Sequence, residues 1–167
     1  DVLPAAFGLG IAVEAFQGAW LKRRWPGHYL AAVLSNYRGF YAQSPTLPQI
    51  MYVMEAMRLG IGFLPPCVNR SGEKFTVEYV VDAQGGRRAM IRMPVTHIQG
   101  LSEDFLERFG QQRQQGPFAG LSEFVNRCRP GPAEVRLILD SGALDGFGLS
   151  RPEMFWRLQR MTSGKGG

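Results

Sequence analysis

Apolar residues in the first third of the chain recur with helical spacing. Over Leu9–Trp25 they cover most of the helix circumference, which predicts a helix that is well buried. Lys22, Arg23 and Arg24 stand in its last turn, where the helix dipole favours basic residues. A proline then separates this helix from a second, short apolar helix expected over His28–Asn36.

The next stretch predicts a third helix and the first strand. A loop is expected over Asn36–Pro45, followed by a helix over Leu47–Leu59 that Thr46 caps. Gly60 stands where a helix commonly closes in a left-handed conformation. The apolar run Ile61–Leu64 then predicts a short strand before a pair of prolines.

Alternation replaces helical spacing in the middle of the chain. Phe75–Val81 and Arg87–Met93 both alternate and flank a glycine-containing turn, so they predict an antiparallel β-hairpin. An isolated hairpin is marginally stable, and we therefore expect it to pack on the helices or on a missing partner. Before it, Cys67–Ser71 predicts a compact turn in which Asn69 and Ser71 bond their own backbone.

Helical spacing returns in the C-terminal half, interrupted by two glycine turns. The whole pattern predicts a fold that is mainly α with one small antiparallel β-hairpin. The last helix opens on a capping box formed by Ser150 and Glu153. The helices are expected over Glu103–Gln115, over about Leu121–Arg127 with Ser122 as its cap or just inside its start, from Pro132 to the closing Gly142, and from Ser150 to about Met161, before a flexible tail over Thr162–Gly167.

The stretch before the first of these helices has the pattern of a helix-hairpin-helix. Gly100 allows a tight backbone turn, and Ser102 is a good N-cap for a helix whose first turn is acidic. In such a motif the free backbone N–H groups at the helix start face a phosphate, so the nucleic-acid backbone is held whatever its base sequence. The alternative is an ordinary glycine loop followed by a capped helix.

A second glycine turn, Ala143–Gly148, gives this half the order helix, hairpin, helix, linker, helix, hairpin, helix. A doubled motif is a compact unit that follows a duplex backbone, so the repetition favours DNA binding. For each basic residue the alternative is a solvated helix face. The residues expected to contact DNA are Gln99, Gly100, Leu101, Ser102, Arg108, Arg113, Arg129 and Arg151.

Composition narrows the class of protein. The 167 residues carry a net charge of +5, mostly through arginine, which permits a nucleic-acid partner without proving one. The cluster Lys22, Arg23 and Arg24 is a candidate phosphate contact, with a solvated helix end as the alternative.

The sequence has two cysteines, Cys67 and Cys128, and only two histidines, which excludes an ordinary zinc site and favours a cytoplasmic protein without disulfides. No apolar run has membrane-spanning length, and the start predicts a segment of a longer chain or a truncated reading frame rather than a signal peptide.

Nine runs of this sequence carry a family resemblance. In chain order they are AWLKRRWP at 19–26, HYLAAVL at 28–34, EAMRLGI at 55–61, LPPCVNRS at 64–71, FTVE at 75–78, IQGLS at 98–102, GPF at 116–118, SGALDGFG at 141–148 and SRPE at 150–153. Their order and spacing resemble the bacterial DNA polymerase III alpha subunits, which are C-family DNA polymerases. The resemblance extends from about Ala12 to Trp156, nearly the whole chain.

The resemblance implies one segment of a nucleotidyltransferase that serves DNA replication. It implies fingers helices over 1–66, a loop and β-hairpin over 67–96, a tandem helix-hairpin-helix over 97–161 and a tail over 162–167. The family polymerises DNA with palm aspartates that hold magnesium ions, and this sequence has no matching pair. No catalytic residue or cofactor is therefore expected in the segment, which is predicted to be inactive alone. The expected partners are double-stranded or primer-template DNA, the remaining polymerase domains and the replisome, with no membrane.

The sequence departs from the family at two places. Ala5, Ala6 and Phe7 stand where the family has a basic Lys-Ser-His run, so a nucleotide contact by that run is not expected here. Gln99 replaces the common lysine of the first hairpin, which removes one phosphate-directed charge but leaves the backbone N–H groups. The Pro-Pro-Cys form of the loop indicates a divergent or error-prone paralogue.

These observations leave two functions open and disfavour a third. The first is a module of a replicative polymerase that binds the DNA backbone without sequence specificity. The second is a structural scaffold that braces the fingers and links domains with no DNA affinity of its own. A free-standing enzyme is disfavoured because the sequence shows no nucleophile–base pair, metal cluster or phosphate-cradling glycine loop.

Overall fold

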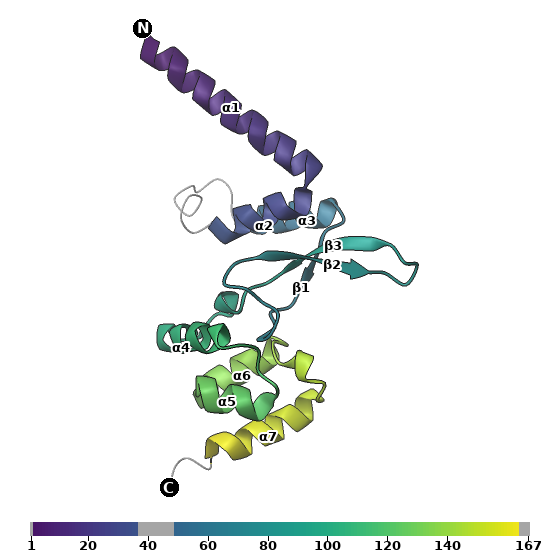
Figure 1. Ribbon diagram of the computed structural model, residues 1–167, viewed down its shortest axis with the longest axis vertical. Helices are drawn as coiled ribbons and strands as arrows, with labels where there is room; N and C mark the ends of the chain where they lie inside the picture. The colour runs from purple at the N-terminus through teal and green to yellow at the C-terminus, as the bar shows by residue number, and fades with distance from the viewer. Residues whose placement is uncertain (1, 37–48, 164–167) are drawn as a thin grey trace. The chain divides into compact units, whose positions relative to one another are not determined.

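The computed structural model describes residues 2–36 and 49–163, and the elements in these ranges are mainly helical (Figure 1). They divide into two compact units, which are described separately. The first unit runs up to Phe63 and includes Val77–Ile91, and the second comprises Leu64–Thr76 and Arg92–Gly167. Among the described residues, no helix is both long enough and apolar enough to cross a membrane.

The first unit packs a helix pair with a three-stranded sheet. Helices α2 (Pro26–Asn36) and α3 (Gln49–Arg58) lie side by side, and the strands β1 (Gly62–Leu64), β3 (Arg87–Arg92) and β2 (Thr76–Val81) pair in that order (Figure 1). Gly27 of α2 lies so close to the sheet that an added Cβ would sit 3.6 Å from Ala89 and 3.7 Å from Val77. The predicted strand and hairpin are confirmed, and the hairpin packs on a helix as expected.

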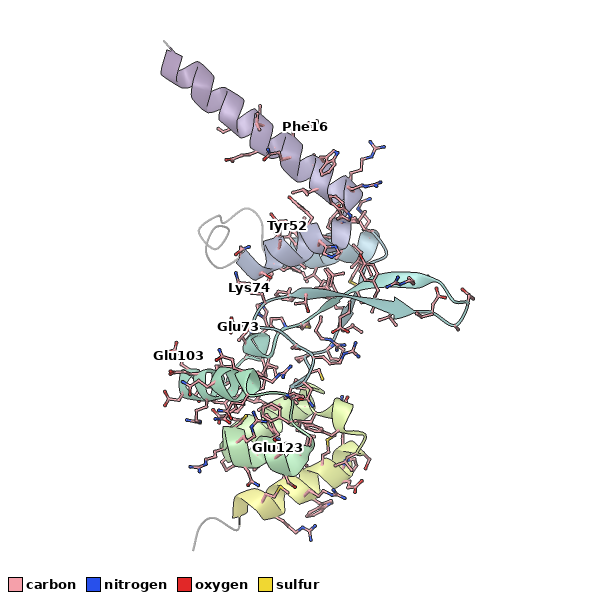
Figure 2. All side chains as sticks on the ribbon, viewed as in Figure 1. Phe16, Tyr52, Glu73, Lys74, Glu103 and Glu123 are labelled. Atoms are coloured by element: carbon pink, nitrogen blue, oxygen red, sulfur yellow. The ribbon has the colours of Figure 1, made fainter. Side chains whose placement is uncertain are left out.

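Helix α1 (Val2–Arg24) forms as predicted but is not buried as predicted. Phe16 is 71% exposed and Trp20 is 51% exposed, and Phe16 projects from the side of the helix (Figure 2). Contact with α2 lies toward its C-terminal end, where Gly18 faces the ring of Tyr29. The prediction of burial is therefore wrong for the described side chains. An apolar pattern shows what a helix could bury, whereas actual burial requires neighbouring elements that cover every side.

The second unit surrounds one apolar core. Its helices are α4 (Glu103–Gln114), α5 (Leu121–Cys128), α6 (Pro132–Asp140) and α7 (Arg151–Ser163) (Figure 1). The helical spacing correctly predicted the buried residues Phe105, Ile138, Met154 and Leu158. Phe155, also expected in the core, is 38% exposed. Each fully buried side chain of this size contributes roughly 1.5–3 kcal/mol to folding.

Hydrogen bonds from two side chains hold the turn that follows the paired prolines. The hydroxyl of Ser71 accepts from the Cys67 N–H at 2.8 Å and donates to the Met93 carbonyl at 2.7 Å, which confirms its predicted bond within the turn. Asn69 instead donates to the Phe118 carbonyl and accepts from the Phe118 N–H, both at 2.8 Å. The prediction that Asn69 bonds its own turn is therefore wrong. Phe118 lies outside a helix or strand, so its backbone groups need partners from elsewhere.

The helix ends agree with the predictions in part. Helix α5 begins one residue before Ser122, which confirms the predicted alternative in which Ser122 lies just inside the helix start. Of the predicted capping box, the structure shows the bond from the Glu153 N–H to the Ser150 hydroxyl, at 3.4 Å. The Glu153 carboxylate pairs with Arg157 instead of accepting the Ser150 N–H. Helix α7 runs to Ser163, so the first two residues of the predicted tail are helical. The loop and helix cap predicted between α2 and α3 lie outside the described residues.

We expect Asn69→Ala to destabilise the second unit. The substitution removes both hydrogen bonds to Phe118, whose side chain is buried, and leaves two backbone groups without partners. The expected loss in the free energy of unfolding is about 1–3 kcal/mol. Urea denaturation measures it, with Asn126→Ala, an exposed asparagine on α5, as the matched control. Equal unfolding midpoints for the two variants would contradict this role of Asn69.

Candidate nucleic-acid interface

The first hairpin connects a single 3-10 turn, η2 (Val95–His97), to helix α4. Gly100 has a φ of +89°, a left-handed conformation that confirms why the turn needs glycine. The hydroxyl of Ser102 accepts a hydrogen bond from the Phe105 N–H at 3.2 Å, which confirms Ser102 as the N-cap. This single turn lies between the hairpin and strand β3, which ends at Arg92.

Helix α6 holds this hairpin through two contacts. A Cβ added to Gly100 would sit 2.9 Å from the Cδ1 of Leu137, so the backbone approaches that side chain closely. The Ser102 hydroxyl donates to the Glu134 carboxylate at 2.5 Å, and the Ser102 N–H lies 3.4 Å from the same oxygen. Glu134 and Leu137 are three residues apart on α6, so one face of that helix receives the hairpin.

The Glu134 carboxylate also closes the start of its own helix. Its second oxygen accepts the Gly131 N–H at 2.7 Å. Partial burial raises the pKa of Glu134, but the hydrogen bonds from Ser102 and Gly131 outweigh it and bring the pKa below its ordinary value. Glu134 is therefore ionised at neutral pH. Its negative charge stands beside the N-terminus of α4, where the helix dipole stabilises an anion.

The second hairpin connects α6 to α7 and contains two left-handed glycines. Gly142 has a φ of +78° and Gly148 a φ of +71°, on either side of the 3-10 turn η3 (Asp145–Phe147). Arg151, the first residue of α7, donates to both oxygens of Asp145, at 3.0 and 3.3 Å. The predicted turn is confirmed. The carboxylate of Asp145 compensates the positive charge of Arg151. Arg151 therefore attracts a phosphate less strongly than an unpaired arginine at the start of α7 would.

The remaining predicted contact residues fall into two groups. Arg108 donates to the Cys128 carbonyl at 3.3 Å, and Arg113 donates to the Asn69 carbonyl at 2.5 Å, so both guanidinium groups hold backbone segments together. Arg129 is exposed and ends α5 in a left-handed conformation with a φ of +47°. Gln99 and Gly100 are exposed as well, whereas the neighbouring leucine is half-buried. Their DNA contacts stay predictions.

The predicted basic cluster lies in the first unit, at the end of α1. Lys22 pairs with Glu55 of α3 at 2.6 Å, so its charge is compensated. Arg23 and Arg24 are exposed, and the Arg24 guanidinium lies 6.0 Å from the ring centroid of Trp25. Two of the three basic side chains therefore remain as candidate phosphate contacts.

Sequence reasoning missed Glu134, which links the first hairpin to α6. A partial signal was present, because a carboxylate in the first turn of a helix that opens on Pro132 commonly accepts backbone N–H groups there. The bond to Ser102 carried no such signal. The two residues are 32 positions apart, so only the tertiary fold brings them together.

Within residues 2–36 and 49–163, no three His, Cys, Asp or Glu side chains gather as a metal site. The expectation that this segment holds no cofactor stays a prediction. Magnesium bound elsewhere in a polymerase stays a prediction.

The chain is similar in sequence to a known motif family and to several known proteins. The family described as the helix-hairpin-helix motif matches residues 60–154. The chain is 29% identical over 93% of its length to an error-prone DNA polymerase of Azoarcus sp. (strain BH72) and 28% identical over 92% of its length to one of Burkholderia mallei (strain ATCC 23344). It is 29% identical over 97% of its length to that of Mycobacterium tuberculosis (strain ATCC 25618 / H37Rv). The chain spans about 14% of the length of each relative, and these similarities confirm the predicted resemblance.

We expect Gly100→Ala to cost more stability than Gly148→Ala. Both glycines have a positive φ, which an alanine adopts at a cost of roughly 1–2 kcal/mol. At Gly100 the new methyl group would also meet Leu137 at 2.9 Å, whereas nothing lies within 4 Å of it at Gly148. Chemical denaturation of both variants measures the difference. Equal losses of unfolding free energy in the two variants would contradict a close steric contact between Gly100 and Leu137 of α6.

We expect Glu134→Gln to remove a pH-dependent part of the stability. Because the pKa of Glu134 is lower in the folded state, its charge stabilises the fold above about pH 4, and this stabilisation is lost as the pH falls through the folded pKa. The wild type should exceed the variant in unfolding free energy by about 0.5–1 kcal/mol at neutral pH, a figure reduced for solvent exposure. The two curves should converge in acid.

The matched control is Glu103→Gln, an exposed acid in the first turn of α4 (Figure 2). Its unfolding free energy should follow that of the wild type more closely across the pH series. A constant offset between wild type and Glu134→Gln at every pH would contradict the role assigned to the charge.

Proposed function

The chain belongs to the helix-hairpin-helix motif family, and we propose that its second unit binds the sugar-phosphate backbone of duplex DNA without reading the base sequence. The observation that carries the proposal is the pair of glycine hairpins, each leading into a helix, on one shared core. Backbone N–H groups at a helix start bind phosphate through their direction and the helix dipole. Two such sites on a rigid core can contact two positions along one duplex.

The exposed residues of the hairpins are the proposed contacts. Gln99 and Gly100 stand at the tip of the first hairpin, and Arg129 and Arg151 are the exposed arginines of the predicted set near the linker and the second hairpin. The guanidinium groups of Arg108 and Arg113 already donate to backbone carbonyls. We therefore propose that these two arginines stabilise the shape of the unit that binds DNA. Contacts of this kind position the protein and carry no base information.

We further propose that this segment serves DNA synthesis within a larger cytoplasmic polymerase. The curated relatives named above are error-prone DNA polymerases, and the chain spans about 14% of their length. The Pro-Pro-Cys form of the loop supports an error-prone rather than a main replicative parent. The remaining polymerase domains, the replisome and palm-bound magnesium are the partners and cofactor of that larger protein in this proposal.

A structural scaffold without DNA affinity is the second candidate. The bonds of Arg108 and Arg113 to backbone carbonyls favour it, as does the Glu134 carboxylate beside the first hairpin. A scaffold needs no exposed cationic surface. It therefore predicts that affinity for DNA is negligible at every salt concentration.

We expect Gln99→Lys to strengthen DNA binding and to make it more dependent on salt. The substitution places one cation at the exposed tip of the first hairpin. The DNA polymerase III alpha subunits that the sequence resembles commonly have a lysine at this position. One added phosphate contact should steepen the fall of log K with log salt by about 0.9. Fluorescence anisotropy of a labelled primer-template duplex across a salt series measures the slope.

The control is Gln114→Lys, which adds the same charge at the far end of α4. Gln99→Glu should weaken binding. Equal gains from the two lysines would contradict a phosphate site at the hairpin, and no binding at low salt by a chain shown to be folded would favour the scaffold.

A further inference from the structure

The first unit carries several exposed aromatic rings with arginines beside them, at positions outside the two hairpins. We call the set Trp20, Trp25, His28, Tyr79, Arg24 and Arg87 the ring row. Two pairs of its rings lie close together: the ring centroids of Trp20 and Trp25 are 5.4 Å apart, and those of His28 and Tyr79 are 6.3 Å apart. Trp25 and His28 meet as walls of one groove.

That groove has a volume of about 440 Å³ and lies between α1 and α2. Leu21, Tyr29 and Ala32 complete its lining with Trp25 and His28, so the groove is mostly apolar. A cavity of this size falls in the range that holds a small planar ligand. Trp25 is 45% exposed and Tyr79 is 51% exposed, so part of each side chain is accessible to a partner.

The sheet places its part of the row on the face that α2 covers. The side chains of Val77 and Ala89 face Gly27 of α2, where an added Cβ would lie within 3.7 Å of both, and strand alternation puts Tyr79 and Arg87 on the same face. The Arg87 guanidinium lies 5.3 Å from the Tyr79 ring centroid. Its neighbour Arg88 lies on the opposite face and pairs with Asp82 at 3.8 Å.

Cations therefore alternate with rings along the surface. Arg24 lies over Trp25, and Arg87 lies over Tyr79. Lys22, by contrast, is compensated by Glu55. An apolar docking surface does not need exposed guanidinium groups stacked on its rings, whereas a site for bases and phosphates needs both. Rings offer stacking surfaces to bases, and arginines attract the phosphates between them.

We propose that the ring row binds single-stranded nucleic acid, with bases stacked on Trp25 and Tyr79 and phosphates held by Arg24 and Arg87. A duplex fits this surface poorly, because its bases are already stacked on one another and turned inward. The site is separate from the hairpins that we propose for duplex binding, and neither proposal depends on the other.

The test measures binding of the whole chain to a labelled oligothymidylate and, separately, to a blunt duplex. Tyr79→Ala and Arg87→Ala should each weaken binding of the oligothymidylate, the first by about tenfold, which is the size of a lost base-stacking contact. Tyr79→Phe keeps the ring and should retain most of the affinity. Binding of the blunt duplex should be unchanged in all three variants.

The matched controls lie on the opposite face of the same strands. Val80→Ala on β2 and Arg88→Ala on β3 should leave oligothymidylate binding within about twofold of the wild type, because they remove no ring and no unpaired cation from the row. A folded wild-type chain that does not bind oligothymidylate would overturn the proposal. Equal losses from Arg87→Ala and Arg88→Ala would overturn it too, since only general charge would then matter.

Discussion

The position of the first hairpin depends on its contact with helix α6. Ser102 donates to Glu134, and the backbone of Gly100 rests against Leu137 one helical turn away. A methyl group at Gly100 would force the Leu137 side chain to shift, and a residue without a hydroxyl at Ser102 would lose both the cap of α4 and the hydroxyl bond to α6. The same two residues therefore determine the local turn and its tertiary placement.

This contact couples the two hairpins. Helix α6 holds the first hairpin on one face and leads directly into the second, so both belong to one apolar core rather than to two linked modules. The coupling also has an electrostatic consequence. The ionised Glu134 already stands beside the N-terminus of α4, so the phosphate contact that we propose for this hairpin is at its exposed tip, Gln99 and Gly100.

Local patterns predicted most of the elements, because helix periodicity, caps and glycine turns are properties of neighbouring residues. The cap at Ser102, the positive φ of Gly100 and the buried face of α4 were all visible in the sequence. Long-range partners were not. Asn69 has two groups that could bond its own turn, yet it bonds Phe118, 49 positions away. The exposure of α1 was missed because an apolar pattern does not show which neighbours are present.

For the candidate site, the sequence predicted where the hairpins lie but not which groups their side chains bond. The sequence identified the hairpins and their arginines, but not that Arg108 and Arg113 bond carbonyls or that Glu134 binds Ser102. Arginine on a helix face has the same local pattern whether it meets solvent, phosphate or backbone. Only the three-dimensional arrangement separates these roles.

We propose that both hairpins contact the backbone of one duplex. Titration of a nitrogen-15-labelled chain with a short blunt duplex, followed by amide chemical shifts, tests it most directly. We expect joint shifts of the amides at 98–102 and 148–152, with one apparent affinity that weakens as salt rises. Shifts confined to one hairpin, or amides of both hairpins that stay unchanged while the duplex binds elsewhere, would contradict it.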